Sequence, residues 1–120
     1  MKTIAIYGDS ISTGTHGEGG YEAMLKSSLS LEKVYNFAVG SSGLTRKTPG
    51  GMLEVLDKNP VPEDAELFLI WHGSNDWYWG SGMEEFSHGV KEAVNRLRAA
   101  APTAELVWVT PIYRFECPDG

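Results

Sequence analysis

The sequence has few of the residues that build disulfides, metal sites or polyanion-binding surfaces. Cys117 is the only cysteine, so no intramolecular disulfide can form and no pair of thiols can ligate a metal, as in a reducing cytoplasm. Arg46-Lys47 is the longest run of basic residues, and the formal net charge is −6. Nucleic acid and anionic membranes are poor partners for such a surface. We expect no cofactor and no metal.

Long hydrophobic runs are absent as well. Ile4–Tyr7 is the only early apolar run and is much shorter than the hydrophobic region of a signal peptide, and no run has the length of a membrane span. Hydrophobic residues still make up 42% of the 120 residues, with four Trp and five Tyr, which is too apolar for a disordered chain. We predict a cytoplasmic protein with a single domain over residues 1–120.

Strand-like and helix-like segments alternate along the chain. Four short runs rich in Ile, Val, Leu or aromatic residues are predicted strands: Thr3–Tyr7, Lys33–Val39, Glu66–Trp71 and Glu105–Thr110. Helical spacing predicts one helix with Tyr21, Met24, Leu25 and Leu29 on one face, a shorter one within Thr48–Lys58, and a long one over Gly82–Ala101 with the stripe Met83, Phe86, Val90, Val94 and Leu97. This alternation predicts a three-layer α/β/α fold with a parallel sheet.

Ligands of open parallel sheets bind beyond the carboxyl ends of the strands, and the polar residues of this sequence gather at those positions. Gly8-Asp9-Ser10 follows the first strand, Gly40 the second, and Gly73-Ser74-Asn75-Asp76 the third. Ser10 offers a hydroxyl, Gly40 an unobstructed N–H, and Asn75 a neutral amide donor. Each alone is more often a turn or capping residue. Together, the Gly40 N–H and the Asn75 amide are the parts of an oxyanion hole.

In these three blocks the sequence resembles the SGNH hydrolases, also called GDSL esterases and lipases. Gly8-Asp9-Ser10 matches block I, Gly40 the glycine of block II, and Gly73–Asp76 the Gly-x-Asn-Asp of block III. The resemblance implies a flavodoxin-like SGNH hydrolase fold and a serine esterase or acylhydrolase that cleaves carboxylic esters, with acetyl or short acyl groups, through an acyl-Ser10 intermediate.

The resemblance also implies a role for each matched residue. The oxyanion would be bound by the N–H groups of Ser10 and Gly40 and by the amide of Asn75. Asp9, Gly73 and Asp76 are expected to support the loops, with the carboxylates accepting main-chain N–H groups rather than transferring protons. Asn75→Ala should therefore impair turnover far more than folding.

The family's general base lies in a block V motif, Asp-x-x-His, that this sequence lacks. We therefore expect a chain truncated after its fourth strand, with its C-terminal part missing and its activity impaired, because serine needs an adjacent proton acceptor. The base is unknown. His72 is the best placed of the histidines, although a structural role is favoured for it. His16 lies in a Gly-rich loop, and Glu85-x-x-His88 is typical of a solvated helix pair.

Other features leave alternatives open. Trp77 and Trp79 could form a wall of the substrate cleft, or pack in the core or a dimer patch.

The expected partner is a small-molecule ester substrate, and a homo-oligomer or a complementing C-terminal fragment is possible. The alternative function is a non-catalytic small-ligand-binding module with the same fold. A flavodoxin-like nucleotide or phosphate binder ranks last, because no Gly-x-Gly-x-x-Gly or P-loop lysine is present. The sequence leaves the acyl and alcohol specificity open.

Overall fold

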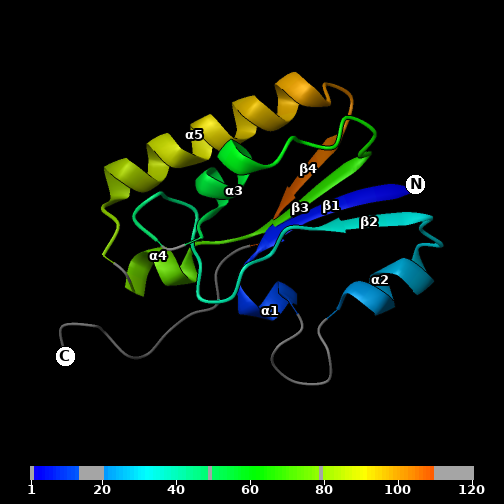
Figure 1. Ribbon diagram of the computed structural model, residues 1–120, viewed down its shortest axis with the longest axis horizontal. Coiled ribbons are helices and arrows are strands. Elements are labelled where there is room, and N and C mark those ends of the chain that lie inside the picture. The colour runs from blue at the N-terminus through cyan, green and yellow to red at the C-terminus, as the bar shows by residue number, and fades with distance from the viewer. Residues whose placement is uncertain (1, 14–20, 49, 79, 110–120) are drawn as a thin grey trace.

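The computed structural model describes residues 2–13, 21–48, 50–78 and 80–109, without the side chains of residues 10, 11, 74 and 78. Strands and helices alternate through this part of the chain (Figure 1). The elements are β1 (Thr3–Gly8), α1 (Ser10–Thr13), α2 (Glu22–Ser28), β2 (Lys33–Asn36), α3 (Met52–Lys58), β3 (Leu67–Trp71), α4 (Ser74–Tyr78), α5 (Met83–Ala100) and β4 (Glu105–Trp108). The four predicted strands are confirmed. Each coincides with its prediction at one end and differs from it by one to three residues at the other, and Thr110 lies outside the described residues.

The strands form one parallel sheet in the order β2-β1-β3-β4. Ile4 of β1 pairs with Val34 of β2 on one side and with Leu67 of β3 on the other. Main-chain bonds continue past the end of β2, since Phe37 N donates to Ile6 O at 2.8 Å and Val39 N donates to Gly8 O at 2.9 Å. The chain therefore stays beside β1 until it reaches Gly40, at the same edge of the sheet where β1 ends.

The two faces of the sheet are covered unequally. Figure 1 shows α3 and α5 on one face and α1 and α2 on the other, which gives the predicted three-layer α/β/α arrangement. The α3/α5 face carries the larger core, whose buried members include Ala5, Tyr7, Leu44, Met52, Leu53, Leu56, Phe68, Ile70, Ala93 and Leu97. The core on the other face has Ile4, Ile6 and Leu31 as its buried members. Most of the apolar burial that stabilises the described residues thus lies under α3 and α5.

The predicted helix faces are partly wrong. Helix α2 has no buried residue: Tyr21 and Leu25 pack against the smaller core, whereas Met24 is 70% exposed and Leu29 is 45% exposed. Met83, predicted on the buried stripe of α5, is 82% exposed. The buried residues of α5 are Gly89, Ala93 and Leu97. Small side chains let the helix lie close to the sheet, and a pattern of large apolar residues does not detect them.

Two short helices at the carboxyl ends of strands were predicted only as loops. A single residue separates β1 from helix α1, and two residues separate β3 from helix α4. Figure 1 places both helices beside the carboxyl ends of the strands, where the candidate site residues lie. Within the described ranges, no helix is both long and apolar enough to cross a membrane.

Candidate active site

The chain turns sharply after β1, at the segment that carries Asp9 and Ser10. Ser12 N and Thr13 N donate to Asp9 O at 3.0 and 3.1 Å, so the helical turn α1 begins as soon as the strand ends. A side chain on Gly8 would collide with the side chain of Ser12, which is buried in this turn. Asp9 is also buried, at 4% exposure. Ser10 is the first residue of α1, and its side chain lies outside the described part of the structure.

The turn after β2 leaves Gly40 accessible. Ser42 N donates to Val39 O at 3.3 Å across this turn, and Ser41 has the positive φ of 61°. The left-handed position of the turn, which favours glycine, is therefore taken by Ser41 and not by its neighbour Gly40. A Cβ built on the exposed Gly40 would meet no heavy atom of the described residues within 4 Å. Neither packing nor backbone geometry requires a glycine at this position.

The next part of the same loop is held by the carboxylate of Asp76. Leu44 N donates to Asp76 Oδ2 at 2.7 Å, and Thr45 N donates to Oδ1 at 3.0 Å. Thr48 closes the loop internally, since its hydroxyl accepts from Gly43 N at 3.0 Å and donates to Thr45 O at 2.8 Å. Asp76 is 2% exposed, and a Cβ on Gly43 would lie 2.6 Å from its Oδ2. Asp76 accepts main-chain N–H groups, the bonding expected of a loop-supporting carboxylate.

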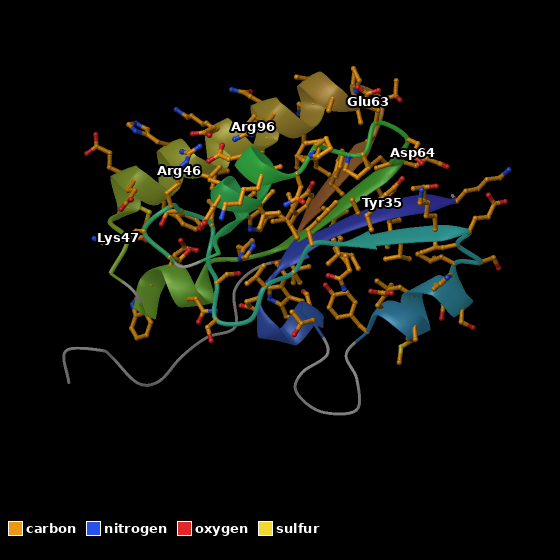
Figure 2. The ribbon with its side chains drawn as sticks, in the orientation of Figure 1. Tyr35, Arg46, Lys47, Glu63, Asp64 and Arg96 are labelled. Atoms are coloured by element: carbon orange, nitrogen blue, oxygen red, sulfur yellow. The ribbon has the colours of Figure 1, made fainter. Side chains whose placement is uncertain are left out.

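Ion pairs tie the outer side of this loop to α3 and α5. Arg46 contacts Asp57 of α3 at 3.0 Å and Glu92 of α5 at 2.7 Å, and Arg96 contacts the same two carboxylates at 2.8 and 3.3 Å. Figure 2 shows Arg46 and Arg96 on the α3/α5 side of the molecule. Hydrogen bonds from Arg46 and then Arg96 lower the pKa of Asp57 to about 2. The side chains are substantially exposed, so the network adds little stability but restricts where the loop can lie.

The carboxamide of Asn75 joins the loops that follow β1, β2 and β3. Gly73 turns the chain into α4 with a φ of 136°, a value that side chains other than glycine rarely adopt. Nδ2 of Asn75 then donates to Ser42 O at 2.8 Å and to Asp9 Oδ2 at 3.4 Å. The structure thus brings together the segments of all three sequence blocks at one amide group.

His72 lies at the end of β3 but inside the protein. It is 2% exposed, and this burial lowers the pKa of the imidazole to about 4. Among the described residues its Nδ1 has no hydrogen-bond partner. The main-chain carbonyl of His72 accepts from Trp108 Nε1 at 3.3 Å. A neutral, buried imidazole with no partner at Nδ1 is poorly placed to exchange protons with a substrate, so the geometry favours the structural role.

Of the remaining predicted residues, the structure describes Glu85, His88 and Trp77. Glu85 and His88 are both exposed on α5, and His16 and Trp79 lie outside the described residues. Trp77 is 42% exposed and lines a cavity of about 190 Å³ with Gly73, Asp76, Ser81, Met83 and Phe86. Asn75 is not among the residues that line this cavity.

Two contributors were missed by sequence reasoning. Ser42 supplies the carbonyl that holds Asn75, and Thr48 supplies the hydroxyl that closes the loop. The Ser- and Thr-rich composition of the segment indicated a loop, but nothing in the pattern pointed to these two. No set of three or more His, Cys, Asp or Glu side chains within the described ranges is arranged to hold a metal ion.

Comparison with known proteins identifies the family of this chain and structures of similar fold. The model of a family described as GDSL-like lipase/acylhydrolase matches residues 6–120. A lipolytic protein of the G-D-S-L family from Desulfitobacterium hafniense is 16% identical over 99% of this chain and 65% of its own, with a TM-score of 0.79. The acetyl xylan esterase AlAXEase is 17% identical over 91% of this chain and 58% of its own, with a TM-score of 0.69.

A third similar structure is the psychrotrophic esterase EstA from a Pseudoalteromonas species, inhibited by monoethylphosphonate. It is 17% identical over 93% of this chain and 62% of its own, with a TM-score of 0.65. The chain spans 56%, 60% and 65% of the length of three of the chains that it matches. No curated protein sequence matches it significantly. Because the family model covers nearly the whole sequence, this chain belongs to the GDSL-like lipase/acylhydrolase family.

Proposed function

We propose that this chain is the part of a carboxylic ester hydrolase that carries the nucleophile and the oxyanion site. Ser10 Oγ attacks the ester carbonyl, and the N–H groups of Ser10 and Gly40 and the amide of Asn75 bind the oxyanion. The observation that carries the proposal is the Asn75 amide, whose Nδ2 lies 2.8 Å from Ser42 O and 3.4 Å from Asp9 Oδ2. An amide fixed before the substrate arrives stabilises developing charge without reorganising.

Gly40 gives independent support. Neither its backbone nor its packing requires the absence of a side chain, so the open space above it is available to a ligand. A substrate oxygen can approach the N–H of a glycine closely because no Cβ stands in the way. Esterases of similar fold, AlAXEase and EstA, are consistent with an acyl ester as substrate.

The proton acceptor for Ser10 lies, in this proposal, outside the described residues. His72 is buried with a pKa lowered to about 4, and His88 is exposed on α5. Added imidazole should then act as an external base and raise the rate at which Ser10 reacts. Imidazole also cleaves activated esters by itself, so the rates are taken above those measured without protein. On that basis the compound should have no effect on a Ser10→Ala variant, which has no hydroxyl to deprotonate.

The test combines covalent labelling with turnover. A fluorophosphonate probe should label the wild-type chain at Ser10, and p-nitrophenyl acetate should be hydrolysed faster in the presence of imidazole. Asn75→Ala should lower the rate by about 10²- to 10³-fold, the usual cost of removing one oxyanion donor. Absence of labelling with and without imidazole, together with ligand binding that survives Ser10→Ala, would instead support the non-catalytic binding module.

A further inference from the structure

The two hydrogen bonds of the Asn75 amide differ in quality. Nδ2 lies 2.8 Å from Ser42 O, within the ordinary range for N–H···O bonds, and 3.4 Å from Asp9 Oδ2, beyond that range. A primary amide has two hydrogens, and here each has an oxygen to face. One is held firmly by the loop after β2, and the other weakly by the residue that precedes the nucleophile.

The firm partner is itself fixed. Ser42 is 1% exposed, its hydroxyl donates to Val39 O at 2.7 Å, and its N donates to the same carbonyl at 3.3 Å. The Ser42 carbonyl therefore cannot turn away without opening the turn that carries Gly40. An oxyanion that needs a hydrogen of the Asn75 amide has to take the one that faces Asp9.

The contact with Asp9 also determines whether the nitrogen or the oxygen of the Asn75 carboxamide faces the site. The nitrogen and oxygen of an Asn side chain have nearly the same size, so their positions are set by hydrogen-bonding partners. Ser42 O and Asp9 Oδ2 are both acceptors, and a flipped amide would place its own oxygen against two others. Without Asp9 only one acceptor would oppose the flip, and a flipped Asn75 would present an oxygen to the oxyanion and repel it.

We propose that Asp9 is a positioning residue that acts through Asn75. Its carboxylate keeps the amide nitrogen turned toward the site and holds the second hydrogen until the oxygen of the substrate takes it. The long bond makes this transfer inexpensive, because little is lost when it breaks. This inference rests on the proposed ester hydrolase function. Asp76 does not position the Asn75 amide, because its carboxylate accepts hydrogen bonds from Leu44 N and Thr45 N.

The first experiment is a double-mutant cycle on hydrolysis of p-nitrophenyl acetate. Asp9→Ala should lower kcat by up to about 100-fold with little change in KM, since misplacement of a catalytic group has effects of this size. Asp9→Asn, which retains an acceptor oxygen, should recover most of the loss. In an Asn75→Ala background, Asp9→Ala should have no further effect. Additive losses, or no recovery by Asp9→Asn, would overturn the proposal.

The second experiment does not depend on activity or on the stability of Asp9→Ala. The side-chain amide signals of Asn75 are identified in a ¹H–¹⁵N spectrum by their loss in Asn75→Ala. Asp9→Asn should shift one of the two hydrogens and leave the Ser42-bound hydrogen in place, and labelling of Ser10 by a fluorophosphonate should shift the same one. Unchanged signals in Asp9→Asn would overturn the positioning role, whereas failure of Ser10 to react would overturn only the proposed function.

Discussion

The two halves of the loop after β2 differ in almost every physical respect. Residues 43–48 are closed by Thr48 and by the buried carboxylate of Asp76, and Gly43 has no room for a side chain. Residues 39–42 end in an exposed turn where Gly40 has room to spare. One half is a rigid support and the other is an accessible surface held by that support. Gly43 in the first half is a packing requirement, whereas Gly40 in the second is not, and in the proposed function its open side faces the substrate.

The largest loss of stability is expected when the carboxylate of Asp76, which holds residues 43–48, is removed. Asp76→Ala leaves the buried N–H groups of Leu44 and Thr45 without acceptors and should lower the free energy of unfolding by about 4 kcal/mol, at about 2 kcal/mol for each. Urea unfolding at neutral pH measures the change. Asp76→Asn, which keeps one acceptor oxygen, is the matched control and should lose about half as much. A loss below about 1 kcal/mol for Asp76→Ala would show that the loop is held by other contacts.

The next effect concerns His72, a buried side chain whose Nδ1 has no hydrogen-bond partner among the described residues. Its pKa in the folded protein is about 4, below the ordinary value of 6.5. Above pH 6.5 the imidazole of His72 is neutral in both the folded and the unfolded protein. Between about pH 6.5 and 4 only the unfolded protein binds a proton at this residue. Stability should therefore fall as the pH drops from about 6.5 to about 4, by about 1.4 kcal/mol per pH unit and about 3 kcal/mol in all.

Urea unfolding over this pH range tests the expectation. His72→Gln removes the titrating group and should flatten the pH dependence, whereas His88→Gln, on the exposed side of α5, serves as the matched control and should leave the slope as it is. Equal slopes for wild type and His72→Gln would mean that His72 does not carry this linkage.

A third change tests the steric difference between the two glycines directly. Gly43→Ala places a methyl group 2.6 Å from Asp76 Oδ2, so the carboxylate or the loop has to move. Overpacking of this kind costs about 2 kcal/mol, with added loss if a bond to Asp76 lengthens. Thermal unfolding measures the effect. Wild-type stability of this variant would mean that the rigid half adapts more easily than its close contacts indicate.

The smallest effect on stability is expected at Gly40. Gly40→Ala adds a methyl group to open space at a residue whose φ is not in the left-handed range, so the free energy of unfolding should change by less than about 0.5 kcal/mol. The same methyl group would stand where the substrate oxygen approaches in the proposed function, so hydrolysis of p-nitrophenyl acetate should fall sharply. Full activity of this variant would remove Gly40 from the site, and a loss of stability equal to that of Gly43→Ala would remove the distinction between the two halves.

The sequence predicted the parts of the fold that depend on local patterns. Runs such as Glu66–Trp71 are short and apolar because parallel strands are covered on both faces, and the strand β3 was found there. The long helix α5 was also predicted, but its buried side was misjudged at Met83 and at Gly89. Burial of a small residue depends on how closely the helix approaches the sheet, which no local pattern records.

The candidate site, like the fold, was predictable only where local sequence patterns carry the information. Ser10, Gly40 and Asn75 were predicted because they stand at the ends of successive strands, a position that the chain order encodes. Ser42 was missed because its contribution is a carbonyl group, which every residue has. Asp9 and Asp76 were grouped together as loop supports, yet one faces a side-chain amide and the other two main-chain N–H groups. Only tertiary structure separates two carboxylates of identical chemistry.

The unequal covering of the sheet has a consequence for how the molecule opens. Helix α2 buries none of its own residues, and the core beneath it has few members, whereas α3 and α5 cover the larger core. Amide hydrogens of α2 should therefore exchange with deuterium through a low-energy local opening, and those of β3 only through global unfolding. Asp9 and α1 follow β1 on the side of the sheet that α2 covers, while the loop held by Asp76 lies on the side of the larger core. The proposed ester hydrolysis would thus take place at the boundary between a part of the fold that opens easily and a part that opens only on global unfolding.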